Sequence, residues 1–539
     1  MVYEKDILGG RHTRDMIDFF LNRARPHVHL WLLILVFGVS FFVYLALFES
    51  FGAYRSSSDY ARDYLIAHHI VSLGEFPLTG PEGLFGPTSN SPAYFYILAL
   101  FLLIHDSIIF LGLANVFLQA CSVLILVLLA RELFGWKTAY VSALFFVLCE
   151  FTLEQAQELW QPYFMSPFLM LSWLLLVYGY KKKKNILLAS SCIAFSLALV
   201  IHSSALAVLP VFVALLALVL FSQKAPLSRY LTVFGTFVAA IVVMFSPLMY
   251  FIAHHGNAAY VGKYVVPHVS IPLPYELFFR MLTELRLFFG SFFHLNAFFG
   301  WAVLACVAFA SAAAIVYGGQ TRRRYLSIIT GIIVFNALCV SLVHSGDGFS
   351  IRYFTPAYGA LIILISELVV GSFPTIRQFI PVKIAAVVVI LFFGAYPFFA
   401  QVDLDPVRVA TFQVRPVDSD LNLAKDMPHI FPAIDAIIAE TGDPRSFAYY
   451  VYIHRYRSSD ATFWTALEEH YRTPFVRVDD AAPRGYAPLA VRPSYIIVRC
   501  LYSLPGTCGE MFFPSRPGYR IDRLLYQSET ASYILLERI

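Results

Sequence analysis

The chain has 539 residues, of which 59% are hydrophobic, 17% aromatic and only 14% charged. A soluble domain carries about 25% charged residues, so this composition, with a mean hydropathy of +0.68, indicates a polytopic membrane protein. The formal net charge of +4 is small and scattered, without a dense basic face, which argues against nucleic acid as a partner.

The first apolar run follows a polar segment, residues 1–28, whose basic residues all precede it. The run covers residues 30–48, close to the ~20 residues that a helix needs to cross ~30 Å of hydrocarbon. No small-residue cleavage site follows, and the apolar core is too long for a signal peptide. The sequence therefore predicts an uncleaved first transmembrane helix with a cytoplasmic N-terminus.

Further apolar runs of about span length follow along the chain: 107–130, 138–151, 163–180, 186–201, 204–221, 231–252, 297–318, 325–343, 353–372 and 384–400. Residues 93–104 are too few to cross. If they do not cross, these basic clusters all lie on the side of the N-terminus: Arg131/Lys137, 181–184, Lys224/Arg229, 322–324 and Arg377/Lys383. The predicted fold class is a polytopic α-helical membrane protein with about 11 transmembrane helices, at most about 13, plus juxtamembrane helices in the first outer loop.

This topology collects the polar, non-basic loops on the outer face, the first of them residues 49–106. After about residue 401, Pro, Asp and Arg become common and apolar stretches shorten to strand length. The predicted strands are 447–453, 495–498 and 533–536, and the predicted helices are 434–439 and 461–471. We therefore expect a transmembrane domain over residues 1–401 and a C-terminal periplasmic α/β domain over residues 402–539.

The C-terminal portion contains Cys500 and Cys508, which bracket a short loop with Pro and Gly. Two such thiols form a disulfide if this portion faces an oxidising compartment. Two free thiols or half of a metal site are the alternatives, although no His or second Cys pair of zinc spacing lies nearby. The disulfide is the preferred interpretation.

The first outer loop opens with Ser56-Ser57-Ser58-Asp59, whose hydroxyls can cap the free N–H groups of a helix. A helix over about 60–73 places Asp59, Arg62 and Asp63 on one face and apolar residues on the other. Such a helix is expected to lie at the membrane surface. A capped helix with an ordinary ion pair is the alternative interpretation.

Several features of the stretch 59–96 occur together in one known family. A carboxylate lies just outside the first span, an arginine follows three residues later, a helix ends in Gly-Glu-Phe-Pro, and Ser-Pro-Ala-Tyr-Phe-Tyr enters an aromatic helix. This pattern resembles the GT-C superfamily, and more closely the bacterial lipid A aminoarabinose transferases and protein O-mannosyltransferase-like enzymes. Two later segments are also similar to the family, Arg131-Glu132-Leu133-Phe134-Gly135 and Trp160-Gln161-Pro162. The resemblance implies an integral membrane glycosyltransferase that uses a polyprenyl-phosphate-linked sugar.

The resemblance carries the family's catalytic carboxylate to Asp59 and its arginine to Arg62. The chain departs from the family pattern at two positions. Tyr60 replaces the acidic residue that follows the catalytic aspartate, and Ser91 stands where aminoarabinose transferases have a lysine. A phosphate contact from that lysine must therefore come from elsewhere.

Further candidate substrate-binding residues lie in later outer loops. The second acidic residue that the resemblance implies is Glu158, with Glu154 as the other candidate. Arg352, in a loop that begins at His344, is the candidate for holding the lipid phosphate, because cationic donors stabilise phosphate and Arg-Tyr-x-x-Pro here also resembles the superfamily. Snorkelling of Arg352 to lipid headgroups is the alternative. His344 and Lys263 complete the set, Lys263 lying in a loop that could close over the donor.

Adjacent histidines at 68/69 and 254/255 raise the question of a metal site. Adjacent histidines on a helix point apart, and no carboxylate–histidine pattern completes a site. We therefore assign no metal ligand and require no cofactor; a divalent metal is not supported by the sequence.

The sequence thus predicts an inverting glycosyltransferase in the bacterial inner membrane that moves a sugar from polyprenyl phosphate to a lipid or glycan acceptor at the periplasmic face. Lipopolysaccharide core or lipid A is the expected acceptor. Asp59 would act as the base, since a carboxylate is deprotonated at neutral pH. The alternatives are an O-antigen polymerase or ligase, which relies on outer-loop Arg and His, and a non-enzymatic lipid or sugar flippase. A flippase should show charged residues inside its spans, where Glu367 is a lone exception here.

Overall fold

The structure is a computed structural model. It describes residues 28–45, 58–80, 82–83, 86–89, 91–157, 159–255, 274–292, 297–317, 319–343 and 353–372. In the C-terminal portion it describes residues 430–432, 434–436, 439, 447–453, 456–458, 495–501, 519–527 and 531–538.

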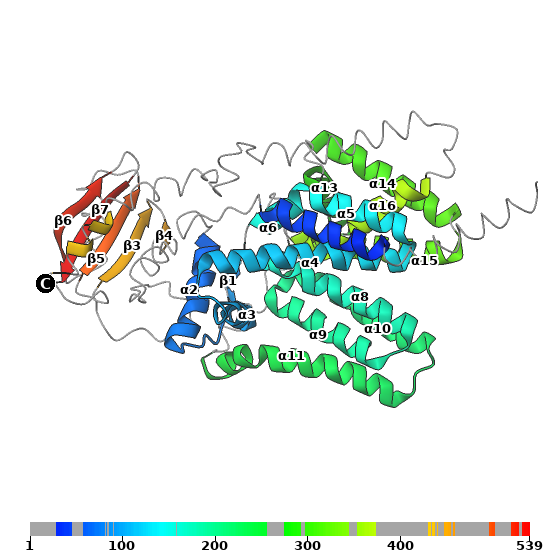
Figure 1. Ribbon diagram of the computed structural model, residues 1–539, viewed down its shortest axis with the longest axis horizontal. Helices are drawn as coiled ribbons and strands as arrows, with labels where there is room; N and C mark the ends of the chain where they lie inside the picture. The colour runs from blue at the N-terminus through cyan, green and yellow to red at the C-terminus, as the bar shows by residue number, and fades with distance from the viewer. Residues whose placement is uncertain are drawn as a thin grey trace, which may run out of the picture.

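Helices form almost all of the described chain up to residue 372 (Figure 1). The N-terminal half contains the first helix (Val28–Leu45), α2 (Ser58–Leu73), the short strands β1 (Glu82–Gly83) and β2 (Gly86–Ser89), α3 (Ala93–Leu102), α4 (Ile108–Phe134), α5 (Trp136–Leu148), α6 (Glu150–Gln157), α7 (Gln161–Phe164), α8 (Ser166–Lys182) and α9 (Asn185–Ile201). The 3-10 helix η2 (Ser203–Val208), α10 (Leu209–Ser222), α11 (Leu227–His255), α13 (Pro274–Phe292), α14 (Ala297–Tyr317), α15 (Gln320–Val343) and α16 (Thr355–Ser372) follow.

A helix occupies each predicted apolar run up to residue 372, and the last run, 384–400, lies outside the described residues. Among the described helices, six segments are long and apolar enough to cross a membrane: Val28–Leu45, Ile108–Phe134, Gln161–Lys182, Ser203–Ser222, Leu227–His254 and Gln320–Leu342. The remaining apolar helices are shorter. A helical membrane architecture is therefore confirmed, while the number of spans, about 11 by the positive-inside rule, stays a prediction.

Helix α4 runs through the centre of the helices (Figure 1). Helices α8 and α11 lie on one side of it, and α5 and α16 lie on the other. The side chain of Ser107 caps its first turn by accepting a hydrogen bond from the backbone N–H of Ile109 at 3.2 Å. Gly135, with φ of 94°, ends α4 and alone separates it from α5. An L side chain rarely adopts this φ, so the turn favours glycine.

Close packing between helices replaces the hydrophobic effect as the source of stability inside a bilayer. The rings of Phe195 and Phe212 stack at 4.1 Å, and Phe237 contacts both, which joins α9, α10 and α11. Gly179 on α8 leaves room for Leu188 on α9, because a Cβ at Gly179 would overlap that side chain.

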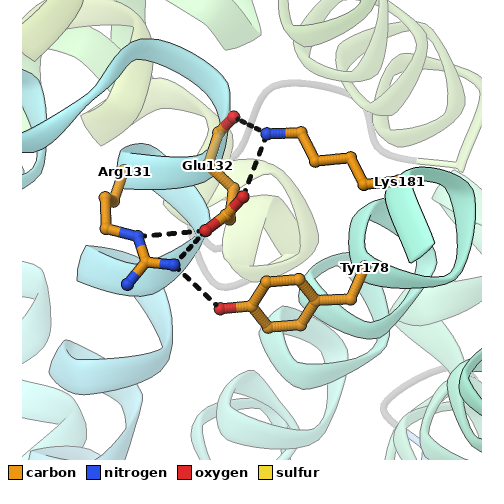
Figure 2. A network of polar contacts seen from close by, with 4 residues as sticks. All are labelled: Arg131, Glu132, Tyr178 and Lys181. Carbon is orange, nitrogen blue, oxygen red and sulfur yellow. Dashed lines mark hydrogen bonds and ion pairs between the residues drawn. The ribbon is translucent and has the colours of Figure 1, made fainter.

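The end of α4 opposite Ser107 is held to α8 by a polar network (Figure 2). The carboxylate of Glu132 accepts hydrogen bonds from Arg131, with Nε at 3.0 Å, and from Lys181, with Nζ at 2.9 Å. Arg131 also reaches the hydroxyl of Tyr178 at 3.5 Å. The carboxylate of Glu132 is therefore paired with two cations, Arg131 and Lys181, at this end of the bundle.

A second ion pair lies among α5, α15 and α16. Arg322 Nε is 2.6 Å from one carboxylate oxygen of Glu367, and the hydroxyl of Thr138 donates to the other at 2.6 Å. Thr138 and Glu367 are buried. The guanidinium of Arg322 lies against Gly371, where a Cβ would overlap it. Glu367, the exception to the absence of charged residues inside the predicted spans, is therefore paired.

The described C-terminal strands form a five-stranded sheet in the order β4-β3-β5-β7-β6. The strands are β3 (Phe447–Ile453), β4 (Tyr456–Ser458), β5 (Tyr495–Leu501), β6 (Tyr519–Gln527) and β7 (Ala531–Arg538). Strands β3 and β5 run parallel, and the other pairs are antiparallel. In Figure 1 the sheet stands on the side of the helices at which α2 lies. All three predicted strands are present; the α/β character of the domain and its boundary at 402 stay predictions, and the helix expected at 461–471 lies outside the described residues.

Candidate active site

Helix α2 carries the predicted catalytic carboxylate. It begins at Ser58, so Asp59 lies in its first turn, and Gly74, with φ of 69°, directly follows its last residue. The expectation of one polar and one apolar face does not hold over residues 63–70, while the position of the helix at the membrane surface stays a prediction. Except for the half-buried His68, residues 63–70 are buried on every side, because α3 and α4 pack against α2.

A buried polar contact joins α2 to α7. The side-chain amide of Gln161 donates to the carboxylate of Asp63 at 3.1 Å, and both residues are buried. Asp63 is one helical turn after Asp59, and Gln161 is three positions after Glu158. The contact therefore joins the helix that carries the candidate base to the segment that follows the second candidate carboxylate.

Two buried amides on α4 hold α6 and α7 in place. Asn115 Nδ2 donates to the carbonyl of Gln155 at 3.0 Å, and Gln119 Nε2 donates to the carbonyl of Tyr163 at 3.1 Å. The Gln155 carbonyl lies near the C-terminal end of α6, where helices leave carbonyls without an internal partner. Asn115 thus satisfies a helix end that is buried away from water.

The last turn of α2 is tied to the loops around it by histidines. His68 Nδ1 lies 2.9 Å from the carboxylate of Asp106, which precedes α4, and His69 Nδ1 lies 3.8 Å from the carboxylate of Glu75.

The Tyr96 hydroxyl on α3 donates to the carbonyl of Pro77, and burial raises the pKa of this hydroxyl above its usual value. The hydroxyl therefore stays protonated and remains a donor at neutral pH.

Ser91, which replaces the lysine of the aminoarabinose transferases, has a packing role. It is buried, its hydroxyl donates to the carbonyl of Met244 on α11 at 2.8 Å, and it accepts from the N–H of Ala93 at 3.2 Å. Pro247 lacks an N–H, so the carbonyl four residues earlier loses its helical donor, and Ser246 donates to it at 2.8 Å. Ser91 therefore links α3 to an irregular turn of α11.

The predicted site residues themselves are only partly placed. Asp59 and Arg62 lie on α2, and their side chains are outside the described residues. The other four, Glu158, Lys263, His344 and Arg352, lie outside the described residues altogether, as does the expected Cys500–Cys508 pairing. Their convergence on one site stays a prediction.

Sequence reasoning missed the roles of Asn115 and Gln119. Both lie in the run 107–130, which the sequence predicts only as a transmembrane helix. Two amides four residues apart occupy one face of a helix, and polar groups inside an apolar span are rare unless they are paired. This spacing is the signal that could have identified them.

Two crystal structures of ArnT from Cupriavidus metallidurans share this architecture. The chain matches the form bound to undecaprenyl phosphate with a TM-score of 0.53 and 13% sequence identity, over 94% of this chain and 97% of ArnT. It matches the apo form with a TM-score of 0.55 and 13% identity, over 95% of this chain and 98% of ArnT. Neither a family model nor a curated protein matches the sequence. The chain therefore has the fold of ArnT, a GT-C lipid A aminoarabinose transferase, as the motifs in 59–96 predict.

Proposed function

We propose that the chain is a membrane glycosyltransferase that moves a sugar from a polyprenyl-phosphate carrier to an acceptor in the bacterial envelope. The observation that carries the proposal is the fold, which the chain shares with ArnT over nearly its whole length. The packing of α2 against α3 and α4 also supports the proposal, because a catalytic carboxylate must be held in a fixed position.

The reaction follows from the chemistry of Asp59. Its carboxylate takes the proton of an acceptor hydroxyl, and the hydroxyl oxygen attacks the anomeric carbon of the donor sugar. A new glycosidic bond forms as the bond between that carbon and the phosphate oxygen breaks, and polyprenyl phosphate leaves with the electron pair. Attack from the face opposite the leaving group inverts the anomeric centre.

The remaining predicted residues supply binding. Arg352 and Lys263 would neutralise the charge that develops on the leaving phosphate, while Arg62 would orient Asp59 or the donor. Glu158 and His344 would contact the sugar or the acceptor. The reaction requires no cofactor, since the lipid phosphate is already an adequate leaving group.

We place the reaction at the periplasmic face of the inner membrane, with the N-terminus in the cytoplasm and the C-terminal domain in the periplasm. The positive-inside rule supports this orientation, because the basic turns between helices then face the cytoplasm. A lipid-linked donor fits this face, where nucleotide sugars are absent. Lipopolysaccharide core or lipid A is the proposed acceptor.

The pairing of Glu367 weighs against a flippase. A transporter would keep ionisable groups inside its spans available to its substrate or coupling ion. The carboxylate of Glu367 already forms an ion pair with Arg322 and accepts a hydrogen bond from Thr138. An O-antigen polymerase or ligase remains the enzymatic alternative.

The test uses the purified full-length protein with a polyprenyl-phosphate sugar and lipopolysaccharide acceptor. Wild-type protein should form the glycosidic product, and Asp59→Asn should lower the rate by about 10²- to 10⁴-fold, the usual contribution of a general base. Asp403→Asn, in the C-terminal portion, is the matched control and should keep full activity. Retention of most activity by a folded Asp59→Asn protein would refute the mechanism. Movement of lipid across the membrane without product would instead support the flippase.

A further inference from the structure

Two helix turns lie side by side at the end of the bundle opposite α2, at the right of Figure 1. The first joins α8 to α9 and contains Lys183 and Lys184, and the second joins α10 to α11 and contains Lys224. The side-chain amide of Gln223 donates to the carbonyl of Tyr180 at 2.8 Å, which fixes the two turns to each other.

Arg229 lies in the first turn of α11, directly after the second of these turns. It is one and two helical turns before Val233 and Phe237, which are buried, and Phe237 contacts the rings of α9 and α10. Arg229 therefore lies on the inward face of α11. Its Nε and Nη2 atoms are buried and have no hydrogen-bond partner among the described residues.

The two turns and the helix ends beside them carry no carboxylate of their own. Residues 180–190 and 221–232 contain no Asp or Glu. Lys181 is engaged by Glu132 (Figure 2), and Lys182 lies 4.9 Å from the ring centre of Tyr178. Lys183 and Lys184 are exposed, and the first turn of α9 has no side-chain cap. A guanidinium that stays partly buried without an acceptor is costly, which points to an anion from outside the chain.

We infer that a basic site formed by Arg229, Lys224 and the lysines at 183 and 184 binds the phosphate headgroup of an anionic phospholipid. Headgroups lie at the ends of spanning helices, where this basic site is. Leu227 and Leu231, beside Arg229 on α11, are 73% and 66% exposed, so apolar surface adjoins the basic site as acyl chains require. Guanidinium and ammonium groups suit a phosphate diester. The inference does not depend on the proposed glycosyl transfer.

The experiment measures lipid binding to the full-length protein in detergent by native mass spectrometry. Phosphatidylglycerol should bind wild-type protein more tightly than phosphatidylcholine. Arg229→Gln should lower the affinity for phosphatidylglycerol by about fivefold or more, since a basic group near anionic lipid contributes about 1 kcal/mol. Arg229→Lys should keep most of the affinity. Arg324→Gln removes an exposed arginine from α15 and is the matched control, expected to change the affinity less than twofold.

Three results would overturn the inference. One is equal affinity of the wild-type protein for the two phospholipids. Another is an equal loss in Arg229→Gln and Arg324→Gln, which would indicate general surface charge. The third is inorganic phosphate that competes with phosphatidylglycerol at equal concentration, which would identify a soluble phosphate as the ligand. Circular dichroism of each variant confirms that the helices are retained.

Discussion

The ion pair between Glu367 and Arg322 makes a quantitative prediction about stability. Replacing Glu367 by Gln keeps the shape of the side chain and an acceptor for Thr138, but it removes the charge. Replacing Gly371 by Ala disrupts the same pair from the other side, because the new Cβ overlaps the guanidinium of Arg322. Both variants should therefore lower the free energy of unfolding.

The magnitude follows from burial. A hydrogen bond to a charged group contributes about 1.5–3 kcal/mol and a neutral one about 0.5–1.5 kcal/mol, so loss of charge at Thr138 costs about 1 kcal/mol. The side chain of Arg322 is 32% exposed, so water can solvate the guanidinium once its carboxylate partner is removed. The loss of the ion pair therefore adds less than about 1 kcal/mol to the cost of the substitution. Glu367→Gln should then cost about 1–2 kcal/mol. Glu367→Ala, which leaves the Thr138 hydroxyl buried without an acceptor, should cost about 3 kcal/mol.

The assay is reversible unfolding in mixed micelles, applied to both single variants and to the double variant. Because Glu367→Gln and Gly371→Ala act on one contact, their effects should be less than additive by about 0.5 kcal/mol or more. Gly331→Ala on α15 is the control, since a Cβ there meets nothing within 4 Å. Additive effects, or an equal loss in the control, would refute the assignment of stability to this ion pair.

Three further predictions concern the end of the bundle at which α2 lies and the C-terminal portion. Asn115→Leu leaves the last carbonyls of α6 buried without a donor and should cost about 1–3 kcal/mol in the same unfolding assay; unchanged stability would contradict the contact. Gln161→Leu removes a donor from the buried carboxylate of Asp63 and should lower glycosyl transfer by about tenfold or more, as displacement of a catalytic helix does; a rate equal to wild type would show that this contact does not position α2. Cys500 and Cys508 should resist thiol labelling without reductant and react after reduction; labelling of both in the oxidised protein would exclude the disulfide.

The sequence predicted most of the helices because long apolar runs determine them with little dependence on tertiary contacts. It placed one helix across 138–151, whereas the chain breaks at Cys149, between α5 and α6. No Gly or Pro marks this break. The Thr152 hydroxyl donates to the carbonyl of Cys149 at 2.8 Å and also to that of Phe146, which satisfies the end of α5. Such a break depends on side-chain contacts that a pattern of hydropathy does not contain.

The candidate site was predictable only in part. The start of α2 at the serine cap and the position of Asp59 follow from local sequence. The contact between Asp63 and Gln161 joins residues 98 positions apart, and it forms only because α2 is wedged among other helices. The burial of residues 63–70 has the same origin, since periodicity does not distinguish a lipid-facing side from a protein-facing one.

The single-residue turn at Gly135 has a consequence for biosynthesis. Helix α5 has 13 residues, so it spans about 20 Å and cannot cross ~30 Å of hydrocarbon alone. Helix α4 is long enough, and Gly135 returns the chain directly along it. The two helices should therefore leave the translocon together as one hairpin, with α5 sheltered by α4 before α16 arrives. A longer linker at this position would release α5 from its partner and favour its retention outside the bilayer.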